Sequence, residues 1–134
     1  MIGWLRLGPR WDEVPLAAID LEATGLDPQH DQILSIAMVP IEQGAICWGQ
    51  RWCEHTRPLV HERTRSTAVT IHGILPGEAA QARPLAEALE HFWSLVRGRV
   101  LIVHCAALDV ALLRQAAKSL GHPTPTFRYV DTME

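Results

Sequence analysis

The stretch AIDLEATGLDP, residues 18–28, ends an apolar run with two carboxylates, Asp20 and Glu22, placed just before a turn. In an extended segment side chains alternate between two faces, so residues two apart share one face. Asp20 and Glu22 are therefore expected to lie side by side. Two like charges this close repel each other, and a bound cation is the simplest way to offset the repulsion. The stretch predicts a buried strand whose end carries a candidate metal site.

The composition is that of one globular domain. The chain has 134 residues, 48% of them hydrophobic and 20% charged, which is enough for a single core. We expect residues 1–15, which show no period, to form an N-terminal arm and residues 16–134 to form the domain. The formal net charge is −3, so any nucleic-acid contact would depend on a local patch or on metal ions.

Cysteine usage and the N-terminus predict a cytoplasmic protein. The three cysteines, Cys47, Cys53 and Cys105, lack CxxC spacing, which favours reduced thiols over a disulfide framework or a zinc site. The N-terminal residues lack the apolar core of a signal peptide, and no apolar run approaches the roughly 20 residues that a membrane helix needs. We therefore expect no membrane partner.

The hydrophobic pattern predicts a mixed sheet of the α/β class. Five apolar or alternating segments are typical of strands, and they are 15–19, 33–41, 44–55, 99–103 and 126–132. Apolar residues at helical spacing from Pro84 to Gly98, and again from Ala106 to Gly121, predict two helices. The order predicts an antiparallel meander of three strands, followed by parallel strands joined through right-handed crossovers. Residues 56–83 are polar and irregular.

Four segments, taken in chain order, resemble the motifs of one family. DLEATGL (20–26) resembles the first motif, usually D-x-E-T-T-G-L, of the DEDDh (DnaQ-like) 3′-to-5′ exonucleases, which include the proofreading epsilon subunit of bacterial DNA polymerase III. The stretch VLIVHCAALDVALL, from Val100, resembles the second motif. TIHGI (70–74) and YVDT (129–132) match two further landmarks of the family. The resemblance covers roughly residues 16–134 and implies a ribonuclease H-like fold.

The resemblance also implies catalysis with two metal ions. Asp20 would bridge two Mg²⁺ or Mn²⁺ ions, Glu22 would bind the ion on the side of the nucleophile, and Asp109 would help to hold the second. Two such ions, about 3.5–4 Å apart, activate a water and stabilise charge on both oxygens of a phosphodiester displacement. The implied substrate is a nucleic acid with a 3′ end, single-stranded DNA by family frequency, and a DNA polymerase is a candidate partner.

Substrate contacts follow from the same resemblance. The candidate substrate-binding residues are Leu21, Thr24, Gly25, Leu26, His72, Cys105 and Leu108. In the family, the residues that match Thr24, Gly25 and Leu26 line the pocket for the 3′-terminal nucleotide. Cys105 and Leu108 replace the usual Asn and Phe of the second motif. His72 either contacts substrate or caps a turn.

The third motif of the family, a His followed five positions later by an Asp, is not found. The sequence ends 25 residues after Asp109, and His122 has Phe127 at the required offset. His104 and Asp109 fit the spacing, but they lie in the second motif, so His104 is not assigned as the general base. We therefore interpret the chain as an exonuclease domain that lacks its C-terminal helices and exposes apolar surface on the sheet. Alone it should be inactive or very weak.

Two other interpretations stay open. One is a non-catalytic nucleic-acid-binding or regulatory module that kept the fold and lost the base. The other is an interaction module in which the Asp20–Glu22 pair is accidental, and this one predicts no Mn²⁺ binding.

Overall fold

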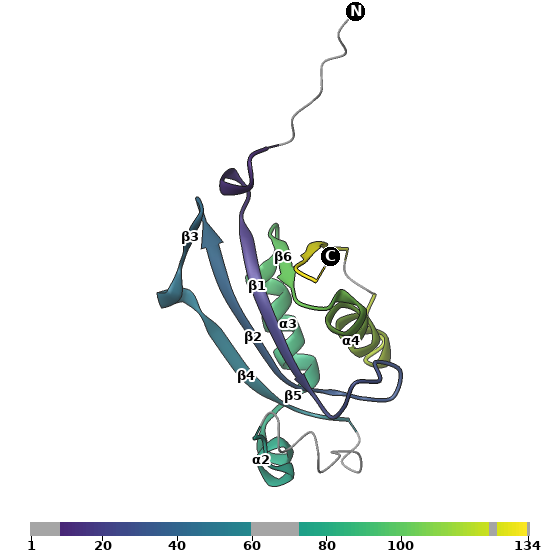
Figure 1. Ribbon diagram of the computed structural model, residues 1–134. Helices are drawn as coiled ribbons and strands as arrows, with labels where there is room; N and C mark the ends of the chain where they lie inside the picture. Colours follow the sequence, from purple (N-terminus) through teal and green to yellow (C-terminus); the bar gives the residue numbers. More distant parts are fainter. Residues whose placement is uncertain (1–8, 60–72, 124–125, 134) are drawn as a thin grey trace, which may run out of the picture.

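The computed structural model describes residues 9–59, 73–123 and 126–133, which form one sheet with helices packed against it (Figure 1). His72 and residues 1–8 of the expected N-terminal arm lie outside the described residues. Within the described ranges, no helix is long and apolar enough to cross a membrane.

The described residues form a mixed sheet of seven strands. The strands are β1 (Leu16–Ala23), β2 (Ile33–Glu42), β3 (Ala45–Ile46), β4 (Trp52–Arg57), β5 (Arg83–Pro84), β6 (Val100–Val103) and β7 (Arg128–Asp131). Their order across the sheet is β5-β4-β2-β1-β6-β7, and β3 pairs with β2. At the centre, β1 is antiparallel to β2 and parallel to β6. The predicted combination of an antiparallel meander with parallel strands, as in a ribonuclease H-like α/β fold, is confirmed.

The strand count of seven exceeds the predicted five because the third predicted strand, 44–55, is interrupted and because the short strand β5 was not predicted. Gln43 and Gly44 turn the chain after β2 with φ values of 49° and 76°, which suits a tight hairpin. The 3-10 turn η2 (Trp48–Gln50) then separates β3 from β4. β3 and β5 are only two residues long and pair with β2 and β4 respectively, so their existence depends on partners that local sequence does not reveal.

Both predicted helices are present, as α3 (Leu85–Val96) and α4 (Ala106–Ser119). A short helix, α2 (Pro76–Gln81), also forms in the segment that was expected to be irregular. The carboxylate of Glu78 accepts the N–H of Leu75 at 2.9 Å, which satisfies a donor that the start of this helix would otherwise leave unpaired.

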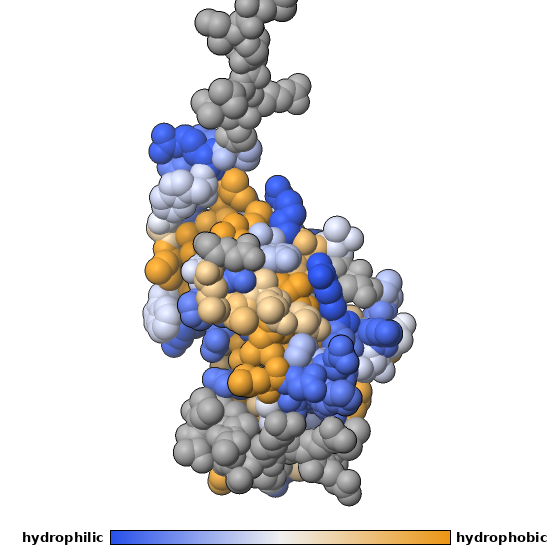
Figure 2. Space-filling model, turned by 45° about the vertical axis from the view of Figure 1, so that its right-hand side comes forward, coloured by the Kyte–Doolittle hydropathy of each residue, from blue (hydrophilic) through white to orange (hydrophobic). Residues whose placement is uncertain are grey.

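The hydrophobic core lies on one side of the sheet, the side that α3 and α4 cover (Figure 1). Ala17 and Ile19 of β1 pack there with fully buried residues of the helices, such as Phe92 and Leu113. The other face of β1 presents Ala18, which keeps part of its surface exposed. The face seen in Figure 2 carries a band of apolar surface between hydrophilic groups. The sheet therefore offers one buried face and one more open face.

Candidate active site

Asp20 and Glu22 lie within β1, because this strand continues to Ala23 and does not end at residue 19. Asp20 lies opposite Ala37 of β2, and Glu22 lies opposite Ser35. Ile19 and Leu21 contribute to the hydrophobic core, so the two acids share the face of β1 that points away from it. Leu21 thus has a structural contact, and its assigned contact with substrate stays a prediction.

Asp109 reaches the same region from the first turn of α4. Its residue is only 9% exposed, and one carboxylate oxygen accepts the backbone N–H of His104 at 3.3 Å. Burial raises the pKa of Asp109, the His104 bond opposes that rise, and the negative charges of Asp20 and Asp131 add to it. The structure therefore brings Asp20 and Asp109 close enough to repel each other, although they are far apart in the sequence.

The three predicted metal ligands are not preorganised as a metal-binding site in the described part of the chain. Among the described residues, no group of three His, Cys, Asp or Glu side chains is arranged to hold a metal ion. Glu22 is partly buried and already has an interaction within the protein. The Asp20–Asp109 pair suits a divalent cation, since both are hard oxygen donors whose repulsion a cation would relieve. The role of Glu22 as a third ligand stays a prediction.

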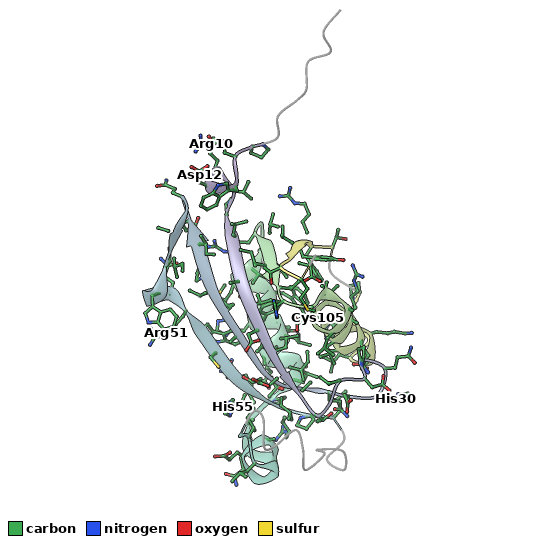
Figure 3. All side chains as sticks on the ribbon, in the orientation of Figure 1. Arg10, Asp12, His30, Arg51, His55 and Cys105 are labelled. Atoms are coloured by element: carbon green, nitrogen blue, oxygen red, sulfur yellow. The ribbon has the colours of Figure 1, made fainter. Side chains whose placement is uncertain are left out.

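A groove of about 630 Å³ begins beside Asp20 on the open face of the sheet. Apolar side chains of β1 and β2, including Ala18 and Val39, form part of its lining. Trp48 and Arg51 also line it, and the Arg51 guanidinium lies 4.9 Å from the centre of the Trp48 ring. Figure 3 shows Arg51 at the outer edge of the sheet. Of the predicted metal ligands, Asp20 lines this groove, together with residues that precede β4.

The loop between β1 and β2 is held by Asp31, a residue that the sequence interpretation missed. The Asp31 residue is 1% exposed. Its carboxylate accepts the Thr24 hydroxyl and the Asp27 N–H, both at 2.9 Å. The Thr24 hydroxyl in turn accepts the N–H of Gln32 at 3.0 Å. An acid placed seven residues after a motif threonine was the available signal, but nothing in the local pattern marks it as buried.

Gly25 and Leu26, both predicted to line the nucleotide pocket, have different surroundings in this loop. A Cβ on Gly25 would lie 2.4 Å from a carboxylate oxygen of Asp31, so only glycine fits against the Asp31 side chain. Leu26 is 82% exposed, so its side chain is accessible. Thr24 is buried and bonded within the loop. Contact of these three residues with substrate stays a prediction.

The junction between β6 and α4 contains a backbone conformation that its residue disfavours. Cys105, which replaces the usual Asn, has φ 117° and precedes the first residue of α4. This region of φ is uncommon for residues other than Gly, and Asn enters positive φ more readily than Cys. Figure 3 shows Cys105 at the start of α4, near the middle of the molecule. Leu108 packs against the hydrophobic core, and its substrate contact, like that of Cys105, stays a prediction.

The family of this chain follows from a direct comparison with known families. Residues 17–134 match the model of the RNase_T exonuclease family. The chain belongs to this family. Its recognition as a relative of the DnaQ-like 3′-to-5′ exonucleases is thereby confirmed.

The curated relatives are much longer proteins. The chain is 27% identical over 122 residues to the PolC-type DNA polymerase III of Staphylococcus haemolyticus, which covers 91% of this chain. It is 28% identical over 115 residues to the PolC-type DNA polymerase III of Staphylococcus aureus, which covers 86% of it. The chain spans only 8% of the length of each relative.

Solved structures of exonuclease I share the fold. The metal-free complex of Escherichia coli exonuclease I with single-stranded DNA matches with a TM-score of 0.78 and 17% identity, over 88% of this chain and 28% of that one. The zinc-bound form of the same complex gives a TM-score of 0.78 and 18% identity, over 88% of this chain and 28% of that one. At these identities the likeness shows the architecture alone.

Proposed function

We propose that this domain takes part in hydrolysing phosphodiester bonds at the 3′ end of DNA, with Mg²⁺ or Mn²⁺ as its metal. The observation that carries the proposal is that the negative charge of Asp20 acts on the buried carboxylate of Asp109, in a chain of the exonuclease family. A buried carboxylate with another carboxylate nearby is unfavourable on its own. A divalent cation between them turns the repulsion into an attractive site.

In the proposal, three acidic residues of this chain bind the metal and another residue contacts the nucleotide. When bound, two divalent ions supply an activated water and stabilise the charge that develops on the attacking and leaving oxygens. Asp20 and Asp109 hold the metal with their carboxylate oxygens, and Glu22, two residues along the same face of β1, is the third ligand. The exposed side chain of Leu26 contacts the terminal base.

The proposal assigns the role of general base to no residue of this sequence. The sequence contains no His and Asp at the spacing of the third motif beyond the second motif. His104 is exposed, but its Nδ1 lies 2.7 Å from the Thr132 hydroxyl, which occupies one ring nitrogen. In the proposal these residues supply metal and nucleotide binding, and the chain should cleave at least about 10²-fold more slowly than a relative that contains the third motif.

DNA and a polymerase partner are the choices that the relatives support. The curated relatives are PolC-type DNA polymerase III proteins, and the structural neighbours are complexes of exonuclease I with single-stranded DNA. We extend both to this chain as part of the proposal: a single-stranded DNA 3′ end as substrate, and a DNA polymerase as partner.

A non-catalytic nucleic-acid-binding module of the same fold is the second candidate. The observation that favours it is that the described residues contain no ready-made group of three metal ligands. Such a module would bind single-stranded DNA without needing a metal ion.

Binding to labelled single-stranded DNA with a 3′ hydroxyl separates the two candidates. Fluorescence anisotropy in Mn²⁺ and in EDTA should show binding that needs Mn²⁺, and Asp20→Ala should weaken it about tenfold or more. Asp12→Ala is the matched control, because Asp12 lies in the 3-10 turn η1 (Trp11–Glu13), before β1. Slow Mn²⁺-dependent shortening of the DNA, with less cleavage of RNA of the same sequence, would support the exonuclease further. Binding that is equally tight in EDTA and unchanged in Asp20→Ala would overturn it in favour of the module.

A further inference from the structure

The Asp-Thr pair at the end of β7 has no role in the proposed chemistry, yet it contacts the segment that carries Asp109. Val103, the last residue of β6, lies beside Asp131 in the parallel pairing of β6 and β7. Beyond this pair β6 gives way to His104, Cys105 and α4. Asp131 and Thr132 therefore lie beside the junction from which α4 begins.

The Asp131 carboxylate binds the backbone at the start of α4. One oxygen accepts the N–H of Cys105 at 3.1 Å, and the other accepts the N–H of Ala106 at 2.6 Å. The first N–H groups of a helix have no partner within the helix and need one from elsewhere. Cys105 precedes α4 but makes no side-chain cap bond. A capping side chain next to the helix normally accepts these N–H groups. Here Asp131 accepts them from a neighbouring strand, and its negative charge is favourable at a helix N-terminus.

Thr132 fixes the other side of the same junction. Its N–H donates to the carbonyl of Val103 at 3.0 Å, which extends the bonding between the two chain segments beyond β7. Its hydroxyl lies 3.2 Å from the same carbonyl and 2.7 Å from Nδ1 of His104. The N–H of His104 in turn donates to the Asp109 carboxylate. A continuous set of hydrogen bonds therefore runs from β7 to Asp109.

This set of bonds also explains how Cys105 keeps a left-handed conformation. A residue other than Gly at φ 117° is unfavourable by roughly 1–3 kcal/mol and persists only where its surroundings hold it. The bond from the Cys105 N–H to Asp131 is such a restraint. The conformation in turn directs the chain from β6 into α4, and so sets where Asp109 lies.

We propose that Asp131 and Thr132 are positioning residues, which fix the start of α4 and thereby hold the Asp109 carboxylate where it can share a divalent cation with Asp20. The proposal rests on the proposed function, because it gives Asp109 a metal to bind. Residues that orient metal ligands typically change metal affinity by about 10–100-fold when they are replaced. Neither Asp131 nor Thr132 is itself a ligand in this scheme.

Calorimetric titration of the full 134-residue chain with Mn²⁺ tests the proposal. Asp131→Ala should weaken Mn²⁺ binding about tenfold or more, and Asp131→Asn, which keeps one acceptor oxygen, should weaken it less. Loss of a negative charge alone would affect both variants equally, so the difference between them reports positioning. Asp12→Asn, which removes the same charge elsewhere, should leave the affinity unchanged.

Thr132 provides a test that changes no charge. Thr132→Val removes the hydroxyl and should weaken Mn²⁺ binding about threefold. Thr132→Ser keeps the hydroxyl and should bind Mn²⁺ as tightly as the unmodified chain does. In the same samples, the amide proton resonance of Ala106 should move upfield in Asp131→Ala, because its hydrogen bond is lost.

Three results would overturn the proposal. If folded Asp131→Ala binds Mn²⁺ as tightly as the unmodified chain, the positioning role is wrong while the metal site stands. Equal affinities for Thr132→Val and Thr132→Ser would likewise refute it, and this pair still gives a result if Asp131→Ala does not fold. If the unmodified chain binds no Mn²⁺, the proposed function fails, and the positioning role fails with it.

Discussion

Asp31 and Asp109 are both buried aspartates, but their surroundings are opposite. Asp31 lies in the loop between β1 and β2, where a hydroxyl and a backbone N–H bind its carboxylate at 2.9 Å. Asp109 accepts one long bond of 3.3 Å and has the charges of Asp20 and Asp131 nearby. A well-bonded buried carboxylate stabilises the fold around it, whereas one that is poorly compensated and faces like charge is available for a ligand.

The backbone near Asp31 is unstrained at Gly25, whereas the backbone near Asp109 is strained at Cys105. Near Asp31 the close approach is made by a glycine, Gly25, which fits without strain. Near Asp109 the left-handed position is taken by Cys105, which does not suit it. Strain of this kind tends to collect at functional sites, where the rest of the structure supports it. The β6–α4 junction thus carries backbone strain at Cys105, which the loop does not have at Gly25.

Removing the Asp31 carboxylate should have the largest effect. Asp31→Ala leaves the Thr24 hydroxyl and the Asp27 N–H without their acceptor, and the free energy of unfolding should fall by about 3 kcal/mol. Urea unfolding measures the loss. Asp12→Ala should cost no more than about 0.5 kcal/mol. A loss below about 1 kcal/mol in Asp31→Ala would mean that the loop does not depend on this carboxylate.

Gly25→Ala should be the next most damaging change. The added methyl would lie 2.4 Å from the Asp31 carboxylate, and such overpacking should lower the free energy of unfolding by about 2 kcal/mol. Gly49→Ala is the matched control, because nothing lies within 4 Å of a Cβ placed there. In an Asp31→Ala background the cost of Gly25→Ala should shrink, since the two changes disturb one contact. Strict additivity in urea unfolding would contradict the contact.

Cys105→Gly should stabilise the protein, in contrast to most glycine substitutions. Relief of the strain at φ 117° should exceed the entropic cost of glycine and raise the free energy of unfolding by about 1 kcal/mol. Cys47→Gly is the comparison, because Cys47 has an ordinary negative φ of −87° and should lose stability. If the urea midpoint falls equally in both variants, the junction is not strained.

Asp109→Asn should give the smallest change, and its sign depends on pH. Below the ordinary aspartate pKa of 3.8 the carboxyl is protonated in both the folded and unfolded states. Because burial and the nearby acids raise the pKa in the folded state, the charged form is penalised there as the pH rises above that value. At neutral pH and without metal, Asp109→Asn should raise the melting temperature by about 2 °C.

The gain in Asp109→Asn should vanish as the pH is lowered toward 3.8. Asp12→Asn is the control, because a bond to Arg10 lowers the pKa of Asp12 and its loss should not stabilise the protein. Differential scanning calorimetry across this pH range measures both variants. A melting temperature of Asp109→Asn below that of the unmodified chain at neutral pH would show that Asp109 is already compensated.

Local sequence was sufficient for the elements that carry their own periodicity. The apolar stripe from Leu85 to Val96 and the buried run from Val100 to Val103 predicted α3 and β6 in nearly their observed bounds. The alternation along β1 placed Asp20 and Glu22 on one face. These patterns are local, so they predict helices and strands without any knowledge of the tertiary contacts.

What the sequence did not predict depends on contacts between distant segments. The β3 and β5 strands are defined by pairing with β2 and β4, and no two-residue pattern indicates a strand. Asp31 is buried and lies against Gly25, six residues earlier in the same loop. Asp131 was assigned to a strand and to a landmark of the family but was given no role, because its bonds to the start of α4 span 25 and 26 residues. These features depend on tertiary contacts, so local sequence patterns do not predict them.

Direct measurement of Mn²⁺ binding tests the central claim, that Asp20 and Asp109 form a site for a divalent cation. Electron paramagnetic resonance follows free Mn²⁺ during titration of the unmodified chain, Asp20→Ala and Asp31→Asn. We predict saturable binding by the unmodified chain and a loss of affinity of about tenfold or more in Asp20→Ala. Folded Asp31→Asn should bind Mn²⁺ with little change. Equal binding by the unmodified chain and Asp20→Ala would contradict the claim.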